Sequence, residues 1–159
     1  MIPEITFSNK LFSEITTIFL IHKDSNISLF NLSKTESKFL KDSLKKDKKN
    51  IDINSYSYRN YFRVIDDKKL PWQVLEEIRK IASKTISSFE DLDDSEIQLF
   101  STFSNEDYLL ALAEGLILSN YKFDKYFTLG DSQIFQCTFK FRLLNIQSWF
   151  SVIMGKYWT

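Results

Sequence analysis

Residues 108–128 read YLLALAEGLILSNYKFDKYFT, an apolar periodic stretch followed by an aromatic and charged one. The first part predicts a helix, because apolar residues recur every three or four positions, at Leu109, Leu112, Ala113 and Leu116. Ser104 is the expected N-cap, and Asp107 is the expected acidic residue of the first turn. Small side chains at Ala111, Ala113 and Gly115 allow a neighbouring element to approach closely. Residues 120–126 have no helical period, so we expect a packed helix to end here and the chain to leave across a surface.

Strand patterns and amphipathic helix patterns alternate on the N-terminal side of this stretch. Residues 15–22 (ITTIFLIH) are typical of a strand buried on both faces. Ser33 and Glu36 have the spacing of a capping box, and Pro71 opens the clearest helical period. We expect helices from residue 33 to about residue 46 and from residue 71, and strands at residues 15–22, 27–32, 52–58, 61–65 and 97–102. The alternation predicts an α/β fold with a mixed, mostly parallel sheet flanked by helices.

Composition restricts the function. A chain of 159 residues with 43% apolar and 16% aromatic content suits one folded domain. Basic and acidic residues number 21 each, so the net charge is zero and we expect no nucleic-acid and no membrane partner. The three glycines lie far apart and form neither a P-loop nor a dinucleotide-binding pattern, which disfavours a nucleotide-binding domain. The single cysteine permits no internal disulfide, and no signal peptide or membrane span is visible, so we expect a cytoplasmic location.

Two segments have features of a binding surface. Residues 41–50 (KDSLKKDKKN) are rich in lysine, but they contain two aspartates and no arginine, so a solvated helix end is preferred over a basic patch for an acidic partner. Residues 51–65 place aromatic side chains beside Arg59 and Arg63, as in a stacking platform for single-stranded nucleic acid. Core or edge packing is the preferred interpretation of these aromatics, which are Tyr56, Tyr58, Tyr61 and Phe62.

The sequence offers no self-contained catalytic constellation. His22, the only histidine, ends a predicted strand and has no cysteine or second histidine nearby to complete a zinc site. A thiol dyad with Cys137, or a Ser–His–Asp triad, has no supporting motif such as Gly-x-Ser-x-Gly. The acidic residues 87–95 lack the glycine and distal glutamate of a calcium-binding EF-hand, so a solvated loop is preferred. No residue is therefore assigned a catalytic, cofactor-binding or metal-binding role.

The opening stretch also carries a family resemblance. Ala113, Glu114 and Gly115 precede a short apolar run, which leads to Tyr121, Phe123 and Tyr126. This order resembles the end of the N-terminal domain of the cytosol (leucyl) aminopeptidases, which commonly shows Ala-Glu-Gly, an apolar run and Tyr-x-Phe-x-x-Tyr. The preceding order of strand, helix and strand also fits, so the resemblance covers residues 12–128 and is specific at residues 113–126.

The resemblance implies an α/β domain similar to a macro domain, packed on a larger C-terminal peptidase domain. In that family two divalent metals, Zn or Mn, sit in the C-terminal domain and activate water for removal of N-terminal amino acids from peptides. Its Asn-Thr-Asp-Ala-Glu-Gly-Arg signature is absent from this sequence, so we expect this chain alone to be inactive and to hold no cofactor. The implied role is scaffolding, with a peptidase domain or further copies of the chain as partners. The alternative is a stand-alone macro-like module for a small ligand or peptide.

Residues 129–159 depart from the family pattern, so we place a boundary after residue 128. The segments QIFQCTFKFRLL (133–144) and WFSVIMGKYWT (149–159) make this part of the sequence rich in aromatic residues. One interpretation is an extra strand and a short helix that cover the surface where the peptidase domain would pack. The other is a tail from a disrupted reading frame. The sequence leaves both open.

Overall fold

The structure is a computed structural model that describes residues 4–8, 11–89, 96–120 and 140–144. The strands of these residues form one sheet in the order β1-β6-β5-β2-β4-β3. Their bounds are β1 (Glu4–Ser8), β2 (Thr16–Ile21), β3 (Asn50–Asn54), β4 (Arg59–Val64), β5 (Glu96–Ser101) and β6 (Lys140–Leu144).

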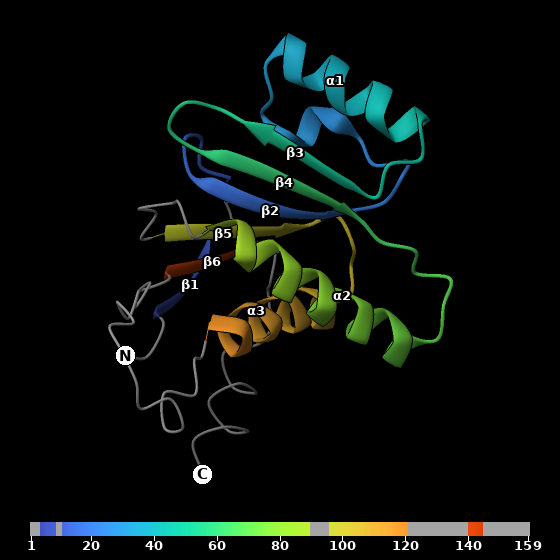
Figure 1. Cartoon of the computed structure of the whole chain (residues 1–159), viewed down its shortest axis with the longest axis vertical. Coiled ribbons are helices and arrows are strands. Elements are labelled where there is room, and N and C mark those ends of the chain that lie inside the picture. Colours follow the sequence, from blue (N-terminus) through green and yellow to red (C-terminus); the bar gives the residue numbers. More distant parts are fainter. Residues whose placement is uncertain (1–3, 9–10, 90–95, 121–139, 145–159) are drawn as a thin grey trace, which may run out of the picture.

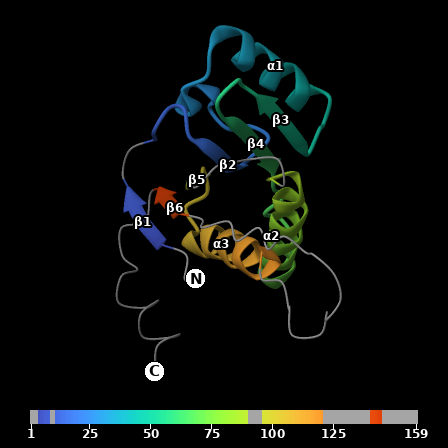
Figure 2. The same cartoon turned by 60° about the vertical axis from the view of Figure 1, so that its left-hand side comes forward.

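The central strand β2 pairs in parallel with β4 on one side and β5 on the other. Strand β6 is parallel to both β5 and β1, whereas β3 is antiparallel to β4. Helix α1 (Lys34–Lys45) covers one face of the sheet, and α2 (Pro71–Ile86) and α3 (Glu106–Asn120) cover the other (Figures 1 and 2). The predicted α/β fold with a mixed, mostly parallel sheet is confirmed.

Strand β2 is buried on both faces, as its sequence predicts, and it separates two apolar cores. Ile18 and Leu20 face α2 and α3, whereas Phe19 and Ile21 face α1. Phe19 stacks on Phe62 of β4 with ring centroids 4.5 Å apart and ring planes 5° from parallel. Burial of an apolar side chain of this size stabilises the folded state by about 1.5–3 kcal/mol. Because successive side chains of β2 are buried on opposite faces, the strand stabilises the packing of helices on both sides of the sheet.

The helix starts follow local capping chemistry. At α1 the Ser33 hydroxyl accepts the Glu36 N–H at 3.3 Å and the Glu36 carboxylate accepts the Ser33 N–H at 2.9 Å, so the predicted capping box is confirmed. Pro71 is the first residue of α2, also as predicted. The N-cap expected at Ser104 is wrong. Helix α3 begins at Glu106, and the side chain of Asn105 accepts the N–H of Asp107 at 3.0 Å.

The expected strand at residues 27–32 is wrong. Residues Ile27–Phe30 form a short 3₁₀ helix, η1. The Asn26 side chain accepts the Ser28 N–H at 3.1 Å and starts the turn, and Asn31 ends it in the left-handed region with φ of 49°. Asparagine is common both where a side chain caps a turn and where the backbone is left-handed. These local preferences at Asn26 and Asn31 outweigh the apolar pattern of the segment.

The expected strand at residues 52–58 is shorter and shifted. Strand β3 ends at Asn54, because the Ser55 N–H donates to the Tyr58 carbonyl at 3.0 Å and closes a hairpin turn into β4. The strands expected at residues 15–22, 61–65 and 97–102 correspond to β2, β4 and β5, and β4 begins earlier, at Arg59. A 3₁₀ turn, η2 (Ser87–Phe89), follows α2, and residues 90–95 of the acidic segment lie outside the described residues.

Strand β6 lies between β1 and β5, so residues 140–144 belong to the same sheet as the rest of the chain. A strand is one part of the first interpretation of residues 129–159, and the short helix and the covering role that it also includes stay predictions, as does the disrupted reading frame. The other residues of that segment lie outside the described part of the chain. The boundary after residue 128 stays a prediction.

Candidate functional site

The carboxyl ends of the parallel strands β2, β4 and β5 meet at one edge of the sheet. At this edge the chain leaves β2 toward α1 on one face, and it leaves β5 toward α3 on the opposite face (Figure 1). Ligands of open α/β sheets bind where neighbouring strands send their connections to opposite faces. The residues that directly follow these strands are therefore the candidate site, which we call the carboxyl edge.

Three connections contribute side chains to the carboxyl edge. His22 follows β2, Asp67 lies beyond β4, and Phe103 lies beyond β5. The His22 Nε2 atom is 3.2 Å from a carboxylate oxygen of Asp67, and the imidazole packs on the Phe103 ring with centroids 4.3 Å apart. The side chains of His22 and Asp67 are 45% and 38% exposed, so a ligand in solvent can reach both.

A hydroxyl pair fixes the backbone beneath His22. The Ser25 hydroxyl accepts the His22 backbone N–H at 2.9 Å and lies 3.1 Å from the Thr102 hydroxyl. These contacts join the connections after β2 and β5. The imidazole is directed to Asp67, whereas the Ser25 hydroxyl is directed to backbone and to Thr102. The Ser25 hydroxyl therefore helps to hold together the loops that follow β2 and β5, and Ser25, His22 and Asp67 are not arranged as a Ser–His–Asp triad.

Tyr108, in the first turn of α3, completes the carboxyl edge. Its ring meets Phe103 edge-on at 5.2 Å. Burial raises the pKa of the Tyr108 phenol and the Asp67 carboxylate raises it further, while a hydrogen bond with Asn105 acts in the opposite direction. The phenol therefore stays protonated near neutral pH. Two aromatic rings, an imidazole and a carboxylate together suit a small cationic or aromatic group.

Sequence reasoning identified only His22 among these residues. Asp67, Phe103 and Tyr108 were missed, although each comes soon after a predicted strand or at a predicted helix start. Among the described residues no three histidine, cysteine, aspartate or glutamate side chains converge as metal donors. Cys137, the other member of the thiol dyad considered with His22, lies outside the described residues. No helix in the described ranges is long and apolar enough to cross a membrane.

The Ala113–Glu114–Gly115 motif lies where α3 crosses α2. Ala113 is buried, and the Glu114 carboxylate accepts a hydrogen bond from Arg79 Nε at 2.9 Å. A Cβ atom added to Gly115 would lie 2.7 Å from the Ala82 Cβ and 2.9 Å from the Arg79 carbonyl oxygen. The close approach expected from small residues is therefore confirmed, and it is made to α2. Tyr121, Phe123 and Tyr126 lie outside the described residues.

The aromatic stretch at residues 51–65 divides between core and surface. Tyr61 and Phe62 are buried, so the preferred interpretation as core is confirmed for them. Arg63 is also buried and donates to Asp52 Oδ1 at 2.6 Å and to the Thr85 hydroxyl at 3.2 Å. Tyr56, by contrast, is fully exposed in the β3–β4 turn. Within residues 51–65, that turn is therefore the part that can present a fully exposed ring to a partner.

Comparison of the sequence with protein-family models and with curated proteins finds no match. The fold is similar to that of tomato leucine aminopeptidase. A solved structure of a point mutant of that enzyme matches 92% of this chain with a TM-score of 0.63 and 9% sequence identity. The chain spans 33% of the length of the tomato protein. At this identity the likeness concerns the fold alone. It agrees with the resemblance of the Ala113–Glu114–Gly115 motif to the leucyl aminopeptidases.

Proposed function

We propose that this chain is a non-catalytic counterpart of the N-terminal domain of leucyl aminopeptidases and acts as a scaffold. The observation that carries the proposal is the structural match, which spans nearly all of this chain and one third of the tomato enzyme. The small-residue motif supports it, because Ala113, Glu114 and Gly115 occur in the order typical of the family and pack α3 on α2. The chain would act by holding a peptidase domain or further copies of itself, in the cytoplasm.

The chemistry of the family is not assigned to this chain. Its two divalent metals require several converging carboxylates, and the described residues do not offer such a donor set. His22 and Asp67 are paired with each other at the carboxyl edge, and no third donor joins them within the described ranges. In this proposal peptide hydrolysis belongs to a separate peptidase domain, as the resemblance to the leucyl aminopeptidases implies.

Sedimentation velocity tests the scaffold role. Assembly through a shared surface predicts that the sedimentation coefficient rises with protein concentration across the micromolar range, toward a defined oligomer. The same experiment with an added leucyl aminopeptidase peptidase domain tests the second partner. A chain that stays monomeric at every concentration and does not sediment with the peptidase domain would contradict the scaffold role.

A second function is favoured by the carboxyl edge. His22, Asp67, Phe103 and Tyr108 gather at the switch point of the sheet, where α/β folds bind small ligands. A stand-alone macro-like module for ADP-ribose or a peptide would use them, although the scarcity of glycine disfavours a pyrophosphate. Calorimetric titration with ADP-ribose and with a leucyl dipeptide tests this. Micromolar binding of either ligand that is abolished in His22→Ala would support the binding module. If neither ADP-ribose nor the dipeptide gave a heat of binding, a module for these two ligands would be excluded.

A further inference from the structure

Four lysines form a straight row on α1. Lys34, Lys38, Lys41 and Lys45 are spaced by four, three and four residues, so they share one side of the helix. All four are exposed, whereas Leu40 and Leu44 on the other side are buried against the sheet. The row extends about 16 Å at 1.5 Å per residue. Three more lysines, Lys46, Lys48 and Lys49, continue the positive charge into the turn before β3.

Within the described part of the chain, no carboxylate forms an ion pair with any of these lysines. Two nearby carboxylates have other partners, since Glu36 caps the helix and Asp47 pairs with Lys23. Asp42, on the flank of the row, is the third carboxylate of the region. Like charges at these spacings destabilise a helix by about 0.2–0.5 kcal/mol per pair. A polyanion that binds along the row would relieve this repulsion.

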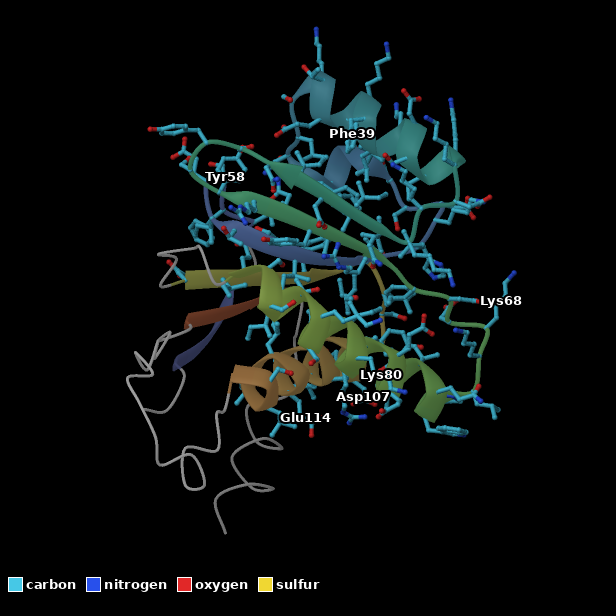
Figure 3. The ribbon with its side chains drawn as sticks, viewed as in Figure 1. Phe39, Tyr58, Lys68, Lys80, Asp107 and Glu114 are labelled. Carbon is cyan, nitrogen blue, oxygen red and sulfur yellow. The ribbon has the colours of Figure 1, made fainter. Side chains whose placement is uncertain are left out.

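The β3–β4 turn places an exposed aromatic side chain near the N-terminal end of α1. The Ser55 hydroxyl donates to Glu36 in the first turn of α1 at 3.2 Å, so the turn is attached to the helix end where the lysine row begins. The next residue, Tyr56, is fully exposed. Figure 3 shows α1, marked by Phe39, and the turn, marked by Tyr58, at the same end of the molecule. The lysine row and Tyr56 thus lie near the same end of α1 but on different sides of it, because Glu36 follows Lys34 by two residues and lies about 200° around the helix from it.

We propose that single-stranded nucleic acid binds here, with phosphates on the lysine row and, where the strand passes the N-terminal end of α1, a base stacked on Tyr56. Proteins that bind single strands without strong sequence preference combine these two features. The zero net charge of the chain does not oppose this, because the fold concentrates the lysines on one helix. An anionic membrane fits less well. Phe39, the exposed apolar residue of α1, lies about 100° around the helix from Lys38 and farther from the other lysines of the row, so it cannot insert while the lysines face the bilayer.

Fluorescence anisotropy with a labelled oligothymidine tests the proposal on the full chain. Four phosphate contacts predict a slope of about −3 in a plot of log association constant against log salt, because each contact on a single strand contributes about −0.7. Affinity should therefore fall roughly 50-fold between about 50 and 200 mM salt. The absence of any anisotropy change at low salt, up to about 100 μM protein, would overturn the proposal.

Matched variants locate the surface. The double variant Lys38→Glu/Lys41→Glu should weaken binding about 10-fold or more and roughly halve the salt slope. Lys80→Glu/Lys84→Glu makes the same charge change on exposed positions of α2 and should leave affinity nearly unchanged. Tyr56→Ala should weaken binding at least about 5-fold through lost stacking. Far-UV circular dichroism checks that each variant folds. If the α1 double variant does not fold, the affinity of Tyr56→Ala alone tests the proposal.

Three results would contradict the proposal. One is an equal loss of affinity in the α1 and α2 charge variants, which would indicate diffuse attraction. Another is binding to phosphatidylserine vesicles without binding to the oligonucleotide, which would make the row a membrane surface. The third is an unchanged affinity in Tyr56→Ala, which would remove the stacking that distinguishes a single strand from any other polyanion.

Discussion

Arg79 of α2 and Glu114 of α3 are joined at 2.9 Å, and Gly115, the residue next to this bridge, marks a close approach of the two helices. The bridge is about 40% exposed on both sides, so it contributes at most about 1 kcal/mol. The backbone contact at Gly115 leaves no room for a methyl group beside Ala82. Close packing at Gly115, more than the ion pair, therefore fixes α3 on α2.

We predict that Gly115→Ala lowers the free energy of unfolding by about 1–2 kcal/mol. Overpacking costs about 1–3 kcal/mol, and the higher helix propensity of alanine returns up to about 1 kcal/mol. The clash is with the Ala82 Cβ and a backbone carbonyl, neither of which can rotate away. Chemical denaturation monitored by circular dichroism measures the loss.

Two control variants make this prediction sharper. Glu114→Gln removes the charge of the neighbouring residue and should cost less than about 1 kcal/mol. Ala82→Gly in the Gly115→Ala background removes one of the clashing atoms, so the two substitutions together should cost less than the sum of their separate costs. A larger loss in Glu114→Gln than in Gly115→Ala would show that the ion pair dominates the contact.

Ser33→Ala should destabilise the protein by about 1 kcal/mol, because it leaves an N–H of the first turn of α1 without its acceptor. The hydroxyl of Ser33 accepts the Glu36 N–H, and the helix is exposed there, so little packing is lost. Ser37→Ala changes a hydroxyl within the same helix without removing a cap, and it should alter stability much less. Equal effects of the two substitutions would contradict the role of the cap.

The pH dependence of stability should include a contribution from Glu36. The Ser33 backbone N–H lowers the pKa of Glu36 from the ordinary 4.5, and the Ser33 and Ser55 hydroxyls lower it further, against the effect of burial. A carboxyl whose pKa is lower in the folded state stabilises the protein above the unfolded pKa, and this stability is lost as the pH falls through the folded pKa. The stability difference between the wild type and Glu36→Gln should thus be larger at neutral pH than well below 4.5.

Denaturant titrations of both proteins at the two pH values measure this difference. Glu76→Gln, on the exposed side of α2, makes the same change of charge away from any helix cap. A Glu36→Gln difference that stays constant with pH would contradict the contribution from Glu36.

Local signals in the sequence predicted most of the architecture. The capping box at Ser33, the proline at the start of α2 and the doubly apolar pattern of β2 each depend on neighbouring residues, so they can be recognised without the fold. The strand expected at residues 27–32 failed because Asn26 and Asn31 form a local turn that apolar periodicity does not detect.

The surfaces were harder to predict, because they depend on strand order. His22 and Asp67 are distant in the sequence and meet because β4 pairs beside β2. Tyr56 and Tyr61 belong to the same aromatic stretch, yet a turn exposes one and the strand that follows buries the other. The position of the exposed ring near the N-terminal end of α1 likewise depends on a contact between distant residues, the hydrogen bond from Ser55 to Glu36.

The most direct test of the proposed non-catalytic role is an aminopeptidase assay on the purified chain. Hydrolysis of leucine para-nitroanilide is followed with Mn or Zn added, with the tomato leucine aminopeptidase as the positive control. The proposal predicts that nitroaniline is released no faster with the chain than in buffer that contains the same metal and no protein. Metal-dependent turnover that elutes with the chain and is abolished by a chelator would contradict it.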